Sequence, residues 1–192
     1  MDVHPLIERA ARGELPSWAE ATPERREHMS RVAGLMEEWA GGLRLSQAEQ
    51  VRFRAAGFLH DTLRDAEPET LRHRVPPALQ RLPERVLHGP AAAERLRNDG
   101  VADGELLLAV AYHTLGHCSF GLLGRALYLA DFLEPGRDLL NDWRRALRSR
   151  MPGEVGAVLS TVLGARIAHL VERGGRLRPE TVAFWNTLAQ VD

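Results

Sequence analysis

Apolar residues recur at intervals of three and four along much of the chain, the spacing that places them on one face of an α-helix. The first such segment starts at Thr22-Pro23, where a capping hydroxyl precedes a proline, and ends at Gly41-Gly42. A second opens at Ser46 and Glu49, which form a capping-box pattern. We expect two amphipathic helices, whose apolar faces carry His28, Val32, Leu35, Met36 and Trp39 in the first and Val51, Ala55, Phe58, Leu59 and Thr62 in the second.

Capping residues and helix breakers divide the rest of the chain. Four prolines between Asp65 and Pro83 indicate loops and short helical turns. Beyond them we expect helices at about 84–98, from Asp103, from Ser119 to Glu134-Pro135-Gly136, at about 153–173, and from Pro179. No run alternates apolar and polar residues over the length of a strand. The sequence therefore predicts a single all-α domain over residues 21–192, preceded by an N-terminal helical extension over residues 1–20.

Composition and charge narrow the classes of function. All 25 basic residues are arginines, and the formal charge of −1 excludes a generally basic surface that coats nucleic acid. The single cysteine, Cys118, rules out an intramolecular disulfide and suits a reducing compartment. No apolar run approaches the ~20 residues of a membrane helix, and the N-terminal residues lack the apolar core of a signal peptide. We expect a soluble cytoplasmic protein without nucleic-acid or membrane partners.

Candidate chemistry lies in histidines and aspartates on or beside the apolar helix faces. His28 is on the first face, His60-Asp61 ends the second helix, and Asp131 interrupts an apolar run. His88 and His113 follow at intervals of 27 and 25 residues after Asp61 and His88. An unpaired polar group on such a face is costly, whereas imidazole and carboxylate groups bind iron, manganese, zinc or cobalt. Each residue also suits a hydrogen-bonded structural role, so spacing alone leaves both interpretations open.

The order of these residues resembles the HD superfamily of metal-dependent phosphohydrolases, whose signature is a histidine, a His-Asp pair and a distal aspartate. The surrounding residues are similar to the bacterial YqeK family over about residues 20–190. The matching segments are Ala55–Asp61 (AAGFLHD), Leu87–Pro90 (LHGP), Tyr112–Gly116 (YHTLG) and Tyr128–Arg137 (YLADFLEPGR). The resemblance implies an all-α HD-domain helical bundle and a symmetrical bis(5′-nucleosyl)-tetraphosphatase, which cleaves diadenosine tetraphosphate to two ADP.

The resemblance also implies a centre of two divalent metal ions, with iron as the first expectation and manganese or cobalt as alternatives. By position, one metal would be held by His28, His60, Asp61 and Asp131. Asp61 would bridge to a second metal held by His88 and His113. A hydroxide bridging the two metals would attack an inner phosphorus of the substrate.

The negative charge of a tetraphosphate requires additional donors. We expect Asp61 and Arg64 to be catalytic, and the substrate to contact Arg64, Gly89, Thr114, Gly116, His117 and Arg137. A dinucleoside polyphosphate is the expected partner, and the sequence leaves open whether the protein forms a homodimer.

The chain departs from the YqeK pattern at three places. Arg64 stands where the family usually has lysine, His117-Cys118 replaces small or basic residues, and Phe184-Trp185 replaces Ala-Arg. The last change puts the substrate preference in doubt. Two alternatives therefore remain: an HD phosphohydrolase acting on another nucleotide or phosphoester, and a non-catalytic HD regulatory module.

Overall fold

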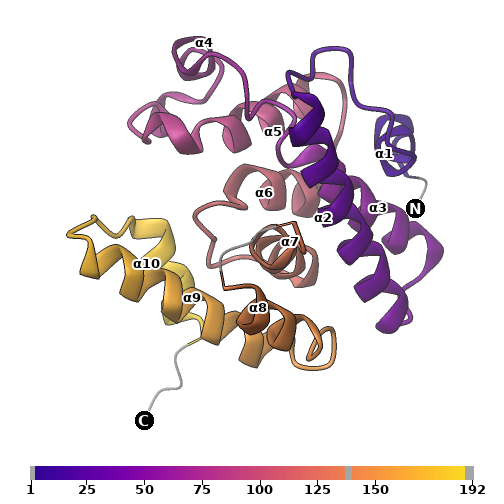
Figure 1. The fold of residues 1–192 in the computed structure, drawn as a ribbon. Coiled ribbons are helices and arrows are strands. Elements are labelled where there is room, and N and C mark those ends of the chain that lie inside the picture. Colours follow the sequence, from indigo (N-terminus) through magenta and orange to yellow (C-terminus); the bar gives the residue numbers. More distant parts are fainter. Residues whose placement is uncertain (1–2, 137–139, 189–192) are drawn as a thin grey trace.

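The computed structural model describes residues 3–136 and 140–188, which are helical with connecting turns and contain no strand. The helices are α1 (Pro5–Ala11), α2 (Pro23–Gly42), α3 (Gln47–Leu59), α4 (Pro68–Arg72), α5 (His88–Asn98), α6 (Gly104–Tyr112), α7 (Leu122–Leu133), α8 (Asn141–Arg148), α9 (Val155–Glu172) and α10 (Pro179–Asn186), with 3-10 turns η1 (Pro77–Leu79) and η2 (Glu84–Val86). The predicted all-α fold of one domain is confirmed (Figure 1).

Most of the predicted helix starts are capped as the sequence indicates. The Thr22 hydroxyl accepts from Arg25 N at the start of α2, and Ser46 and Glu49 form both halves of the capping box of α3. The Asp103 carboxylate accepts from Leu106 N at the start of α6. These local signals succeed because each depends only on residues within one helical turn.

Three predicted boundaries are wrong. The second predicted helix, α3, ends at Leu59, so Thr62 lies in the turn after it and not on its face. The helix expected from about residue 84 begins at His88, because residues 84–86 form a separate 3-10 turn. Ser119 does not cap α7, which begins at Leu122 without a side-chain cap at Gly121. Glu105 of α6 instead accepts a hydrogen bond from Leu123 N at 3.3 Å. A tertiary contact therefore serves one of the free amides at this helix start.

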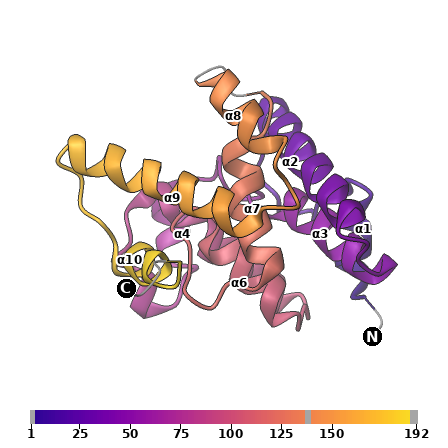
Figure 2. The same cartoon turned by 90° about the horizontal axis from the view of Figure 1, so that it is seen from below.

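Helix α7 lies at the centre of the arrangement (Figure 1). It contacts α2, α3 and α6 on one side and α8 and α9 on the other. Helices α2 and α3 make the most extensive helix–helix contact, and α1 packs on α3. From below, α1 lies at one end of the molecule and α9 and α10 at the other (Figure 2). The ends of α3 and α6 thus meet the flank of α7, and α5 packs on α6 beside them.

A glycine sets the distance between α2 and α3. A Cβ added at Gly57 would lie 2.5 Å from Ala33 Cα and 2.7 Å from Ala33 N. Normal carbon–carbon contacts are about 3.5–4.0 Å, so only a residue without a side chain fits here. Because His60 follows Gly57 by one turn, this close contact places the end of α3 against the buried face of α2.

Helix α9 is long and apolar enough to cross a membrane by length and composition, with a mean hydropathy of 1.4. Its buried residues Val158, Leu159, Val162 and Leu163 belong to the main hydrophobic core. Arg166 also lies within the same helix and contacts Tyr128 and Phe132 of α7. We interpret α9 as a helix of the bundle on these contacts.

Candidate metal centre

The six residues singled out by the sequence converge from five helices or helix ends. His28 lies within α2, His60-Asp61 follows α3, His88 begins α5, His113 follows α6, and Asp131 lies within α7. The four histidines and Asp61 are buried. Helix ends are suited to such a site because they bring side chains together without a continuous backbone crossing the centre.

Asp61 lies in the middle of the histidines. Its Oδ1 is 3.1 Å from His88 Nε2 and 3.4 Å from His113 Nε2. Its Oδ2 is 3.7 Å from His28 Nε2 and 3.6 Å from His60 Nε2. The two oxygens of one carboxylate therefore face two different pairs of imidazole nitrogens.

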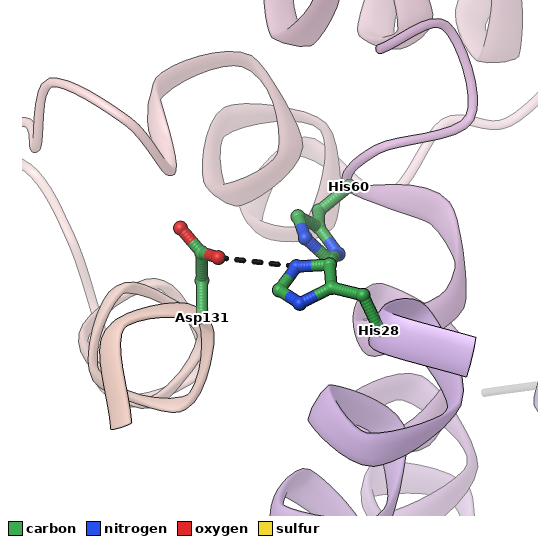
Figure 3. A group of neighbouring side chains, drawn as sticks. All are labelled: His28, His60 and Asp131. Atoms are coloured by element: carbon green, nitrogen blue, oxygen red, sulfur yellow. Dashed lines mark ion pairs between the residues drawn. The ribbon is translucent and has the colours of Figure 1, made fainter. Parts of the chain in front are cut away.

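Asp131 completes one side of the cluster. Its Oδ1 lies 3.2 Å from His28 Nε2, and Figure 3 shows the two side chains pointing toward each other beside His60. Two groups of ligand atoms within the described residues could hold a metal ion: His28, His60 and Asp131, and His60, Asp61 and His113. Each group has its ligand atoms within 4.8 Å of one another.

Backbone carbonyls fix how two of the imidazoles face. The Nδ1 of His60 lies 2.8 Å from Gly57 O, and the Nδ1 of His113 lies 2.8 Å from Val110 O. A carbonyl can only accept, so both Nδ1 atoms carry a proton and the Nε2 atoms face the cluster. This is the arrangement that metal-binding histidines commonly show.

The fully buried His60 provides the test of whether a metal fits. Its Nε2 has no hydrogen-bond partner among the described residues. A buried polar nitrogen without a partner is costly. Burial also lowers the pKa of His60 to about 4, so the ring is neutral at neutral pH and its lone pair is available. A divalent cation would satisfy this nitrogen and the neighbouring Asp61 and Asp131 together.

The charged groups of the cluster shift the pKa values of Asp61 and His28. Burial opposes ionisation of Asp61, but the surrounding His60, His113 and His88 hold its pKa well below its usual range. Burial alone would lower the pKa of His28, yet the neighbouring carboxylates of Asp131 and Glu134 raise it to about 9. Asp61 is therefore ionised at neutral pH and ready to bind a cation.

Sequence reasoning missed two charged residues that contact the cluster. Arg25 Nη1 lies 2.8 Å from Asp61 Oδ2, and Glu134 Oε1 lies 3.3 Å from His28 Nδ1. Arg31 Nε in turn lies 2.6 Å from Glu134 Oε2. Their spacing in the sequence could have indicated them, because Arg25 precedes His28 by three residues and Glu134 follows Asp131 by three. Residues three apart lie on the same side of a helix. Glu134 was interpreted only as part of a helix stop, whereas it orients a proposed ligand.

The predicted substrate-binding residues fall into two groups. Arg64 and Thr114 belong to the first group, which lies near the cluster. Burial lowers the pKa of His88 most, and the positive charge of Arg64 lowers it further. Thr114 Oγ1 is 3.1 Å from His113 Nε2. Gly89 is buried, and a Cβ there would lie 2.8 Å from Val110 O. The structure therefore gives Gly89 a packing role that lets α5 approach α6.

Gly116, His117 and Arg137 complete the set of predicted contacts. Gly116 has a φ of +79°, and a Cβ there would lie 2.2 Å from Phe184 Cδ1. His117 accepts from Ser119 N through Nδ1 and packs on Tyr112, so it organises the turn after α6. Arg137 lies outside the described residues. Phe184, which stands where the YqeK family has alanine, is fully buried and packs in the hydrophobic core.

A cleft opens beside the cluster, with a volume of about 690 Å³. Thr114 and Asp131 line its inner end, and residues of α9 and the segment after it line the remainder. The cleft therefore reaches the candidate metal centre at Asp131.

The HD domain family model matches residues 25–136, a span that begins just before His28 and ends just after Asp131. The chain belongs to the HD domain family. This HD domain thus includes every residue of the histidine–aspartate cluster.

Relatives of this HD domain protein agree with that assignment. It is 26% identical over 162 residues to "Bis(5′-nucleosyl)-tetraphosphatase, symmetrical" of Halalkalibacterium halodurans, covering 81% of this chain and 85% of the relative. It is 29% identical over 98 residues to the protein of the same name from Bacillus subtilis, covering 47% and 52%. The fold is similar to a solved "predicted HD superfamily hydrolase involved in NAD metabolism" from Clostridium acetobutylicum, with a TM-score of 0.76, 23% identity and coverage of 98% and 97%.

Proposed function

We propose that this HD domain protein is a metal-dependent phosphohydrolase that cleaves diadenosine tetraphosphate symmetrically to two ADP. The observation that carries the proposal is the position of Asp61, whose two oxygens face separate pairs of histidine Nε2 atoms. A carboxylate so placed is suited to binding two cations at once. Relatives named as symmetrical tetraphosphatases supply the substrate class.

In this proposal His28, His60, Asp61 and Asp131 hold one divalent metal ion, and Asp61, His88 and His113 hold the second. Nitrogen and oxygen ligands of this kind suit iron, manganese or cobalt. When bound, the metals lower the pKa of an attacking water and polarise the phosphoryl group. The described residues support the donor set through the unpartnered Nε2 of His60 and the fixed protons of His60 and His113.

The protein's own residues position the substrate and neutralise its charge. Arg64 is half-buried and its positive charge reaches His88, so it can pair with a phosphate oxygen next to the second metal position. The Thr114 hydroxyl lies at the same edge of the cluster and can donate to a phosphate oxygen. Glu134 and Arg31 keep His28 oriented toward the centre.

The expected cytoplasmic location stays a prediction. It rests on composition and on Cys118, which is free and exposed. An exposed free thiol suits a reducing compartment.

A product assay tests the proposal. Purified protein is supplied anaerobically with ferrous iron, and separately with manganese, and incubated with diadenosine tetraphosphate; Asp61→Ala is the control. ADP as the sole nucleotide product, absent from the control, is the expected result. AMP plus ATP would contradict symmetrical cleavage, and no turnover with metal bound would point to another phosphoester substrate.

A further inference from the structure

The cleft beside the metal centre is lined by many more basic than acidic side chains. It runs from Thr114 and Asp131 at its inner end outward along α9 and the segment that follows it. Its basic lining residues are Arg85, Arg166, Arg173, Arg176 and Arg178, with His169 among them. Asp131, a proposed metal ligand, is the one carboxylate among the lining residues of the described chain. The cleft is therefore a concave surface suited to an anion.

Four of these arginines have no carboxylate partner within the part of the chain that the structure describes. Within residues 3–136 and 140–188, no carboxylate forms an ion pair with Arg173 or Arg176, nor with Arg85 or Arg178. By contrast, Arg52 pairs with Asp103 at 2.6 Å. Guanidinium groups that are not already paired are available to a negatively charged ligand, so this group is suited to binding one.

Arg166 connects the metal centre to the outer part of the cleft. Its Nη2 donates to Thr114 O at 3.1 Å, and its guanidinium lies 4.8 Å from the Tyr128 ring centroid and 5.6 Å from that of Phe132. These contacts hold the guanidinium in place before any ligand binds, which reduces the entropy lost on binding. Arg166 is thus a fixed cation next to Asp131 and Thr114.

The other arginines of the cleft lie beyond Arg166 along the chain. Arg166 on α9 and Arg173, the residue that caps the end of α9, both line this cleft. They are seven residues apart, which corresponds to about 10 Å along the helix axis. Arg176 and Arg178 follow in the segment leading to α10. In Figure 2 this end of α9 and α10 projects away from α2 and α3, so the row of arginines leads from the metal centre toward solvent.

Apolar side chains lie along the same cleft. Val86 contributes from one side, and Ile167 and Leu170 contribute from α9. Such surfaces suit the faces of a base and a ribose, whereas the arginines suit phosphates. The volume of about 690 Å³ is within the range that small-molecule sites commonly have.

We propose that this cleft binds the nucleoside diphosphate half of the substrate that lies away from the metals, with Arg166, Arg173 and Arg176 contacting its phosphates and Val86, Ile167 and Leu170 its nucleoside. The inference rests on the proposed function, because it assigns a place to one half of a dinucleoside tetraphosphate. It gives the arginines a binding role, since a guanidinium donates hydrogen bonds to phosphate and does not ligate metals.

Binding of ADP to chelator-treated protein tests the site without depending on hydrolysis. Arg173→Gln and Arg176→Gln are compared with wild type by isothermal titration at low ionic strength. Arg9→Gln is the matched control, because Arg9 is exposed on α1 and lies outside the cleft. We expect each cleft variant to weaken ADP binding about tenfold, and the control less than about twofold. We also expect ADP to bind more tightly than pyrophosphate.

Equal loss of affinity in the cleft variants and in Arg9→Gln would overturn the proposal, and so would equal binding of ADP and pyrophosphate. In the metal-loaded enzyme, the cleft variants should raise the KM for diadenosine tetraphosphate about tenfold with kcat nearly unchanged. A fall in kcat at constant KM would refute a binding role. Failure of the proposed function appears separately, as wild-type protein that binds ADP through these arginines but does not cleave diadenosine tetraphosphate.

Discussion

A methyl group added at Gly57 tests the contact that places His60 and Asp61. The new Cβ would lie 2.5 Å from Ala33 Cα and 2.7 Å from Ala33 N, both backbone atoms of α2. A backbone atom cannot rotate away as a flexible side chain can. The helices must therefore separate by about 1 Å to restore a normal contact distance.

The expected cost follows from two opposing contributions. Overpacking a core contact costs about 1–3 kcal/mol, and a backbone clash belongs at the upper end of that range. Replacing glycine by alanine within a helix returns about 1 kcal/mol through the unfolded state. We expect Gly57→Ala to lower the free energy of unfolding by about 1–2 kcal/mol, or about 2–8 °C in Tm for a chain of this size.

Gly34→Ala is the matched control, because Gly34 is an exposed residue of α2 and a Cβ there would meet nothing within 4 Å. It should raise the free energy of unfolding by about 0.5–1 kcal/mol. Urea unfolding of chelator-treated protein, followed by far-UV circular dichroism, measures both variants. Metal titration of Gly57→Ala should also show weaker binding, since the carbonyl of residue 57 accepts from His60.

The reasoning would be refuted if Gly57→Ala were as stable as wild type. A second check uses Ala33→Gly, which removes the Cβ of residue 33 but leaves its Cα and N in place. A double-mutant cycle should show little rescue of Gly57→Ala by Ala33→Gly. Full rescue would mean that a side-chain contact, and not the backbone, limits the approach of α2 and α3.

Three further predictions concern the metal centre and a distant ion pair. Glu134→Gln should weaken metal binding about 10–100-fold in a metal titration, because the neutral side chain holds His28 less firmly; Glu27→Gln, which removes the exposed partner of Arg31, should change it less than about twofold. Adding saturating metal to chelator-treated protein, at about 100 times its Kd, should raise the free energy of unfolding by about 2.7 kcal/mol and Tm by about 5–10 °C; no rise in a thermal melt would argue against binding to the native state. Burial opposes ionisation of Asp103, but its hydrogen bonds with Arg52 and Leu106 N lower its pKa, so its stabilisation is present above the unfolded value of 3.8 and is lost as pH falls below it. Asp103→Asn should therefore cost about 1 kcal/mol at neutral pH in urea unfolding and progressively less below pH 3.8; a difference that does not change with pH would contradict this cause.

Local signals account for the parts of the fold that were predicted. Thr22, Ser46 and Asp103 each cap the expected helix, because a capping side chain bonds to an amide within its own first turn. Ser119 does not cap α7, for the opposite reason: Leu123 N at the start of α7 donates to Glu105, which lies 18 residues before Leu123. The residues next to Ser119 in the sequence do not indicate the contact between Glu105 and Leu123, because it depends on how α6 and α7 pack.

Residue periodicity and order are enough to predict an all-α chain and the six histidines and aspartates that approach one another. Their identity was visible because polar residues on apolar helix faces are rare and costly, and because their order is similar to a known family. Arg25 and Glu134 were not visible, since charged residues at helix ends are common and their distance to Asp61 and His28 depends on how α2, α3 and α7 pack. The arginine cleft likewise exists only in three dimensions. Arg85 and Arg166 are 81 residues apart, and the packing of α9 brings them to one concave surface.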